Sequence, residues 1–96
     1  MLNRVLRFLL YSRSYCHLCD DMRAAFVALD LQIKHELEVV DIDADTAALA
    51  LYDELVPVLV GIDAKRQPRQ LCHYFLDETA VRHFVADVAG SVEPDA

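Results

Sequence analysis

"YSRSYCHLCDDM", residues 11–22, decides how this sequence is interpreted, because it places Cys16 and Cys19 with two residues between them. The run "VLRFLLY" (5–11) is almost continuously apolar and β-prone, which predicts a central strand covered on both faces. Beyond the cysteines, apolar side chains recur with helical spacing at Leu18, Met22, Ala25, Phe26 and Leu29. The two cysteines therefore lie where a predicted strand and loop lead into a helix.

The start of a helix favours a thiolate, because its first backbone N–H groups lack partners within the helix and its dipole is positive there. The thiolate is the nucleophile in thiol–disulfide exchange. Cys16, at the mouth of the predicted helix, is expected to be the exposed attacking residue. Cys19, one turn further along, is expected to be more buried and to resolve the mixed disulfide.

Charged neighbours of the pair act in both directions. Arg13 and a protonated His17 add positive charge, which favours the thiolate of Cys16. Asp20 and Asp21 oppose this effect, because nearby anions raise the pKa of a thiol. The same two carboxylates also stabilise the start of a helix, which gives them a structural reason to be there.

Two other interpretations of the cysteine pair stay open at this point. Buried cysteines pack as small hydrophobic residues, and Cys72 is interpreted in this way. A zinc site needs two more ligands, and the adjacent Cys72 and His73 point to opposite faces of a strand. The C-x-x-C spacing at a strand-to-helix junction favours a redox couple over both.

The remainder of the chain continues the alternation of strands and helices. Strands are predicted at 36–42, 56–62 and 69–75, a short helix at 44–55, and a last helix that Asp77 or Thr79 begins and Gly90 and Pro94 end. The order β-α-β-α-β-β-α predicts an α/β fold, with a four-stranded mixed sheet and helices on both faces.

Composition limits the class of protein. The 96 residues predict a single domain, with an ordered core at about 4–89 and a C-terminal tail at 90–96. A net charge of −7 disfavours nucleic acid and anionic membranes as partners. Three cysteines do not suit a secreted disulfide scaffold, and neither a signal peptide nor a membrane span of ~20 apolar residues is found. A reduced, soluble, cytoplasmic protein is expected.

Four segments together resemble the glutaredoxin-like proteins of the thioredoxin fold over about residues 5–88: "LYSRSYCHLC", "VVDID", "LVPVLV" and a capped final helix. The resemblance implies a thiol–disulfide oxidoreductase with a role in electron transport and cell redox homeostasis. In that case Cys16 is the catalytic nucleophile and Cys19 the resolving cysteine. No metal or prosthetic group is expected, and the protein is expected to be a monomer.

The resemblance also implies a substrate-binding surface and a set of active-site neighbours. The substrate-binding residues are Arg13, Val56 and Pro57, and the neighbours of the active site are Tyr11, Ser12, His17 and Leu18. Pro57 is expected to be cis and to face the cysteine pair. The backbone of Val56 is expected to pair with an extended thiol substrate.

Several positions depart from the glutaredoxin pattern. His17 and Leu18 replace the usual proline and tyrosine, and Leu55 stands where threonine commonly precedes Val-Pro. The Gly-Gly that helps hold a glutathione carboxylate is absent, since "YFLDET" (74–79) occupies that region. Glutathione is therefore predicted to be a poor ligand. The expected substrate is a protein disulfide or a small thiol compound, with glutathione or a thioredoxin-type reductase as the source of electrons.

Two other functions are alternatives to a thiol–disulfide oxidoreductase. One is a metal-binding module, in which Cys16 holds zinc or an iron–sulfur cluster shared between two chains. The other is a non-catalytic binding module of the thioredoxin fold that carries a vestigial or regulatory thiol pair.

Overall fold

The computed structural model describes residues 5–92 and contains one four-stranded sheet with three α-helices. In chain order the elements are β1 (Leu6–Ser12), α1 (His17–Ala28), β2 (His35–Asp41), the short 3-10 helix η1 (Ile42–Ala44), α2 (Thr46–Tyr52), β3 (Val58–Ile62), β4 (Pro68–His73) and α3 (Glu78–Val92). The strands lie in the order β2-β1-β3-β4, with β1 parallel to β2 and antiparallel to β3. The predicted order of elements and the mixed sheet are confirmed.

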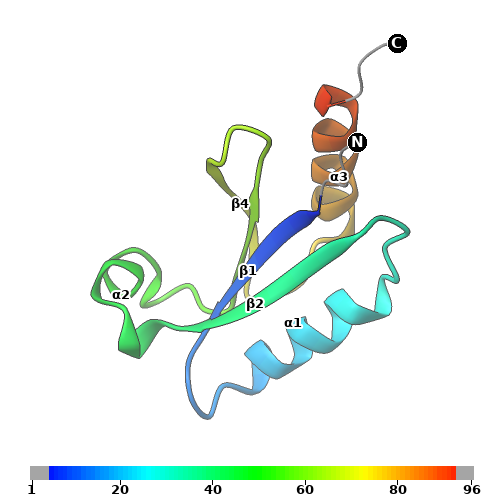
Figure 1. Ribbon diagram of the computed structural model, residues 1–96. Coiled ribbons are helices and arrows are strands. Elements are labelled where there is room, and N and C mark those ends of the chain that lie inside the picture. The colour runs from blue at the N-terminus through cyan, green and yellow to red at the C-terminus, as the bar shows by residue number, and fades with distance from the viewer. Residues whose placement is uncertain (1–4, 93–96) are drawn as a thin grey trace.

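Helices α1 and α3 cover the same face of the sheet and form the main core with it (Figure 1). Phe8 of β1 lies at its centre, with its ring centroid 4.9 Å from that of Phe26 on α1 and 5.6 Å from that of Phe84 on α3. Both ring pairs meet edge to face, the geometry that aromatic quadrupoles favour. The helical spacing of residues in α1 and α3 thus buries one side of each helix against β1.

Phe84 also fills the space where a side chain at position 61 of β3 would lie. A Cβ atom added to Gly61 would stand 2.5 Å from the Phe84 ring, closer than a real Cβ approaches any atom. The guanidinium of Arg69 covers the same ring, with its carbon 5.1 Å from the ring centroid. Glycine in this strand therefore allows helix α3 to pack closely on the sheet.

The opposite face of the sheet is covered only in part. Tyr52 of α2 packs on Tyr11 of β1 with ring centroids 4.7 Å apart, and Val58 and Val60 of β3 are almost fully buried. Toward the start of β1, however, Arg7 is exposed. The prediction that β1 is central is confirmed, but complete cover of its second face is wrong, because the seven residues of α2 reach only one end.

Several predicted element bounds are corrected. Strand β3 begins at Val58 rather than at residue 56, and β2 spans His35–Asp41 rather than 36–42. Helix α2 is shorter than 44–55, because η1 takes residues up to Ala44 and Asp45 then caps α2 by accepting a hydrogen bond from Ala48 N–H at 3.1 Å. Strand β4 ends at His73 rather than at residue 75. Helix α3 continues through Gly90 to Val92, since an interior glycine costs a helix only about 1 kcal/mol. Pro94, the other predicted terminator, lies outside the described residues.

The register of the strands brings two distant segments to one end of the sheet. Tyr11, near the end of β1, pairs with Val58 at the start of β3. The loop that leaves β1 toward Cys16 and the segment that enters β3 through Pro57 therefore adjoin. The β3–β4 hairpin lies at the other end, beyond the pairing of Arg7 with Ile62 (Figure 1). None of the helices described here is long and apolar enough to cross a membrane.

Candidate redox site

Cys16 and Cys19 form a disulfide at the start of α1. Their Cα atoms lie 5.2 Å apart, and Cys16 is the N-cap residue, whose Sγ accepts a hydrogen bond from Cys19 N–H at 3.1 Å. Cys16 is partly exposed and Cys19 is buried. The sulfur that solvent reaches more easily is thus the one that a backbone N–H group at the helix start can stabilise as a thiolate.

The turn before the pair depends on Tyr15, which sequence reasoning did not single out. Its φ of 59° lies in the left-handed region, where residues other than glycine are uncommon, and its side chain is fully exposed. An aromatic residue inside the polar stretch "SRSYC" was a signal that could have drawn attention to it. The structure places this ring directly before Cys16 in the chain and leaves it open to solvent.

Arg13 is held by two carboxylates of the segment that follows β2. Its guanidinium donates to Asp43 at 2.8 Å and to Asp53 at 3.1 Å, with a further bond to the backbone carbonyl of Asp53 at 3.3 Å. Hydrogen bonding to Arg13 lowers the pKa of the Asp43 carboxyl. The sequence suggested that Arg13 adds positive charge to the cysteine pair. The two aspartates instead offset that charge, so Arg13 joins the loop after β1 to η1 and to the C-cap of α2.

The two residues between the cysteines differ in exposure. His17 is exposed, and its Nε2 lies 3.2 Å from a carboxylate oxygen of Asp21, one turn along α1. Leu18 is partly buried. The Asp21 carboxylate therefore offsets the effect that a protonated His17 would have on the sulfurs.

The segment that enters β3 is fixed by Tyr74, a second residue that sequence reasoning missed. The Val56–Pro57 peptide bond is cis, as predicted, and Pro57 is buried while Val56 is partly exposed. Tyr74 donates its backbone N–H to the Pro57 carbonyl at 2.9 Å and its hydroxyl to the Glu54 carbonyl at 2.8 Å. These two bonds attach the loop after β4 to the segment expected to face a substrate.

The two remaining predicted neighbours lie on β1 itself. Tyr11 is partly buried, and burial raises the pKa of its hydroxyl, with Tyr52, Asp45 and Glu38 adding to the effect. Ser12 is the last residue of β1. Both belong to the strand end from which the loop to Cys16 departs. Tyr11 packs on Tyr52 of α2 and pairs with both β2 and β3, and Ser12 pairs with β2.

The start of α3 is occupied by Asp77 in the region where glutaredoxins carry Gly-Gly. A carboxylate oxygen of Asp77 accepts a hydrogen bond from Ala80 N–H at 3.0 Å, and its carbonyl accepts from Val81 N–H at 3.1 Å. The side chain thus caps the helix and takes a donor that an anionic ligand would need.

Cys72 and His73 do not join the pair. Cys72 is half-buried on β4 beside Leu59, and burial raises the pKa of its thiol. The ring of His73 packs on Tyr74 with centroids 4.6 Å apart. Within residues 5–92, no group of three or more His, Cys, Asp and Glu side chains is arranged to hold a metal ion.

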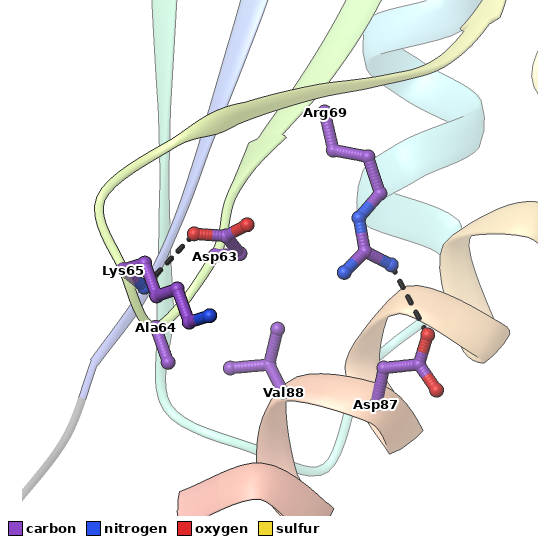
Figure 2. A pocket seen from close by; sticks show the side chains of 6 residues that line it. All are labelled: Asp63, Ala64, Lys65, Arg69, Asp87 and Val88. Atoms are coloured by element: carbon purple, nitrogen blue, oxygen red, sulfur yellow. Dashed lines mark hydrogen bonds and ion pairs between the residues drawn. The ribbon is translucent and has the colours of Figure 1, made fainter.

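A cavity of about 330 Å³ lies far from this site, between the β3–β4 hairpin and α3 (Figure 2). Figure 2 shows Arg69 paired with Asp87, at 3.1 Å, and Asp63 bonded to the backbone N–H of Lys65, at 2.9 Å. Two acidic and two basic side chains line it, so their charges offset one another. We therefore assign the candidate redox site to the Cys16 end of the sheet alone.

Comparisons with known proteins agree with this geometry. The family model described as Glutaredoxin-like domain (DUF836) matches residues 7–86. The solution structure of protein Ne2328 from Nitrosomonas europaea is 36% identical, with a TM-score of 0.72, covering 88% of this chain and 98% of that one. Target protein XcR50 from X. campestris is 28% identical, with a TM-score of 0.58, covering 83% and 96% of the two chains.

More distant structures show the same fold. Thioredoxin from Fasciola hepatica is 19% identical, with a TM-score of 0.60, and the match covers 88% of this chain and 81% of that one. None of the curated proteins matches this chain significantly. With four-fifths of its length matched by one family model and a C-x-x-C pair at the start of α1, the chain belongs to the glutaredoxin-like (DUF836) family of the thioredoxin fold.

Proposed function

We propose that this protein is a thiol–disulfide oxidoreductase that reduces disulfides with its Cys16–Cys19 pair. The observation that carries the proposal is the disulfide at the start of α1, in which the more exposed sulfur accepts a backbone N–H bond at 3.1 Å. A thiolate at this position is stabilised by the N–H group and by the helix dipole, so it is a good attacking group and a good leaving group.

The reaction runs in two exchange steps. The Cys16 thiolate attacks one sulfur of the substrate disulfide, a Cys16–substrate disulfide forms, and the other substrate sulfur leaves as a thiolate that takes a proton from water. Cys19 then loses its proton and attacks the sulfur of Cys16, which releases the second substrate thiolate. Two electrons pass to the substrate, and the enzyme is left in the disulfide form seen in this structure.

Substrate, reductant and compartment belong to the proposal. The substrate is a protein disulfide or a small disulfide, and the electrons that regenerate the dithiol come from glutathione or from a thioredoxin-type reductase. The pair requires no metal or prosthetic group for this chemistry. We propose that the protein works as a monomer in the reducing cytoplasm, where exposed thiols of this kind are kept reduced.

The test is a single turnover of the fully reduced protein with bis(2-hydroxyethyl) disulfide, followed by mass spectrometry of the quenched protein. We expect two equivalents of 2-mercaptoethanol per chain and an intramolecular disulfide that maps to Cys16 and Cys19. A protein that ends as a stable 2-mercaptoethanol adduct on Cys72, with Cys16 and Cys19 still reduced, would contradict the proposal.

A further inference from the structure

A groove of about 280 Å³ lies between α1 and the segment that joins β4 to α3. Its walls are mostly apolar, and include Met22 and Ala25 of α1 and, across from them, Tyr74, Phe75 and Leu76. Phe75 is 68% exposed and Tyr74 is 41% exposed. Exposed aromatic side chains beside an apolar groove are characteristic of surfaces that bind other molecules.

This groove adjoins both halves of the redox site. On one wall, Asp21 lies five residues after Cys16, which is about 8 Å along a helix axis at 1.5 Å per residue. On the other wall, Tyr74 is hydrogen-bonded to the carbonyls of Pro57 and Glu54. A chain that reaches Cys16 can therefore continue into the groove without leaving the surface.

The rim of the groove is acidic. Asp21 and Glu78 belong to its lining, and Asp20 and Asp77 are their immediate neighbours in the chain. Two basic side chains contact this rim: Arg82, whose Nε lies 2.8 Å from Glu78, and His17, whose Nε2 lies 3.2 Å from Asp21. Four carboxylates exceed one guanidinium and one imidazole, so the rim is negative whether or not His17 is charged, in a chain whose net charge is −7. The complementary occupant carries positive charge.

We propose that the groove docks an extended segment of the disulfide-bearing partner protein, with an apolar side chain between α1 and Phe75 and a lysine or arginine beside Asp21 and Glu78. An extended chain advances about 3.3 Å per residue, so the apolar residue stands two or three positions from the cysteine that Cys16 attacks. This inference rests on the proposed function, because it specifies which disulfides that site prefers.

The first experiment compares peptide substrates. Each peptide carries one cysteine as a mixed disulfide with 5-thio-2-nitrobenzoate, whose release is followed in a stopped-flow instrument with the reduced Cys72→Ser protein. The reference peptide has leucine three residues from the cysteine and two flanking arginines. In the others, serine replaces the leucine or glutamates replace the arginines. We expect the second-order rate constant to fall about tenfold without the leucine and at least as much with the glutamates.

Two matched pairs of variants locate the effect in the groove. Phe75→Ser is compared with Val27→Ser, because Val27 is 65% exposed on α1 but does not line the groove. Glu78→Lys is compared with Glu36→Lys, since both glutamates are exposed and each lies near an arginine. We expect the preference for the leucine to be lost only in Phe75→Ser. We expect the preference for arginine to fall about fivefold only in Glu78→Lys.

A binding measurement separates this inference from the proposed function. A redox-inactive reference peptide with serine in place of cysteine is titrated into the oxidised protein, and backbone amide shifts are recorded. Saturable shifts at Ala25 and Phe75 support the groove even if no disulfide is reduced. Equal rates for all peptides without such shifts overturn it even if bis(2-hydroxyethyl) disulfide is reduced. Concentration-dependent dimerisation that Phe75→Ser abolishes would also overturn it, because a second copy would then fill the groove.

Discussion

The three cysteines of this chain lie in two different places in the fold. Cys16 and Cys19 stand at the start of a helix, where the more exposed sulfur accepts a backbone N–H bond at 3.1 Å. Cys72 stands on a strand, half-buried, and burial raises the pKa of its thiol. Cys16 and Cys72 are both partly exposed, and a backbone N–H group of Asp77 also favours the Cys72 thiolate. The two sites therefore differ in the helix start that surrounds Cys16 and in the burial that raises the pKa of Cys72.

The most severe test of this contrast is removal of the exposed sulfur. Cys16→Ser is expected to reduce disulfide reduction to the uncatalysed rate, because the thiol that remains at the helix start, Cys19, is buried. Initial rates with bis(2-hydroxyethyl) disulfide measure the effect, and Cys72→Ser is the matched control. If Cys16→Ser keeps a tenth of the activity or more, Cys16 is not the attacking thiol and its place at the helix start does not explain the activity.

The next largest effect concerns the buried partner of the pair. Cys19→Ser keeps the attacking thiolate but lacks the group that releases the substrate, so mixed disulfides on Cys16 are expected to accumulate. Mass spectrometry after one turnover detects them, and the same variant serves to capture partner proteins. The prediction is contradicted if the adduct appears on Cys72 instead.

Reactions with glutathione test whether the surroundings of the Cys16–Cys19 pair suit an anionic thiol. Arg13 is held by Asp43 and Asp53, and Asp77 caps α3, so these donors are already engaged and are not free for the carboxylates of glutathione. We expect rates with glutathione-mixed disulfides to be at least about tenfold below those with the arginine-bearing peptides.

The matching binding measurement titrates reduced glutathione into the oxidised protein while the amide signals of Val56 and Asp77 are followed. No saturation is expected below millimolar concentrations. Saturable shifts at both residues in the sub-millimolar range would restore an ordinary glutathione site.

The pH dependence of alkylation compares the thiols directly. Because burial raises the pKa of Cys72, its reaction with iodoacetamide is expected to stay slow at neutral pH and to rise only above the pH at which an ordinary thiol ionises. Cys16 in the reduced protein is expected to react at lower pH, since the helix start favours its thiolate. Mass spectrometry of each cysteine across the pH range gives the two profiles. If the alkylation rates of Cys16 and Cys72 depend on pH in the same way, the predicted difference between the two thiols is wrong.

The smallest expected effect is that of Cys72→Ser on stability. Replacing a half-buried thiol by a hydroxyl is expected to lower the free energy of unfolding by about 1 kcal/mol. The folded state holds the Cys72 proton more tightly than the unfolded chain does. The stability that this thiol contributes is therefore full below the unfolded pKa and lost as pH rises above it. Urea unfolding at pH 7 and at pH 10 measures the free energy of unfolding of each protein. Between the two pH values, Cys72→Ser should lose less stability than the unmodified protein does.

Sequence patterns were sufficient for features that depend on local periodicity. The alternation of apolar runs gave the order of strands and helices, and the C-x-x-C spacing located the disulfide at the start of α1. The engagement of Arg13 escaped prediction, because its partners lie 30 and 40 residues away and no local pattern records such pairing. Tyr15 and Tyr74 were missed because both adopt positive φ angles, for which the usual signal is glycine.

The close approach of Phe84 to Gly61 has a consequence for how sequences of this family can vary. The Phe84 ring of α3 occupies the space that a side chain at position 61 of β3 would need. A methyl group at position 61 therefore requires a smaller side chain at position 84, and the two positions are expected to change together during evolution. Gly61→Ala alone should destabilise the fold by about 1–3 kcal/mol, whereas Phe84→Leu in the same chain should recover part of that loss.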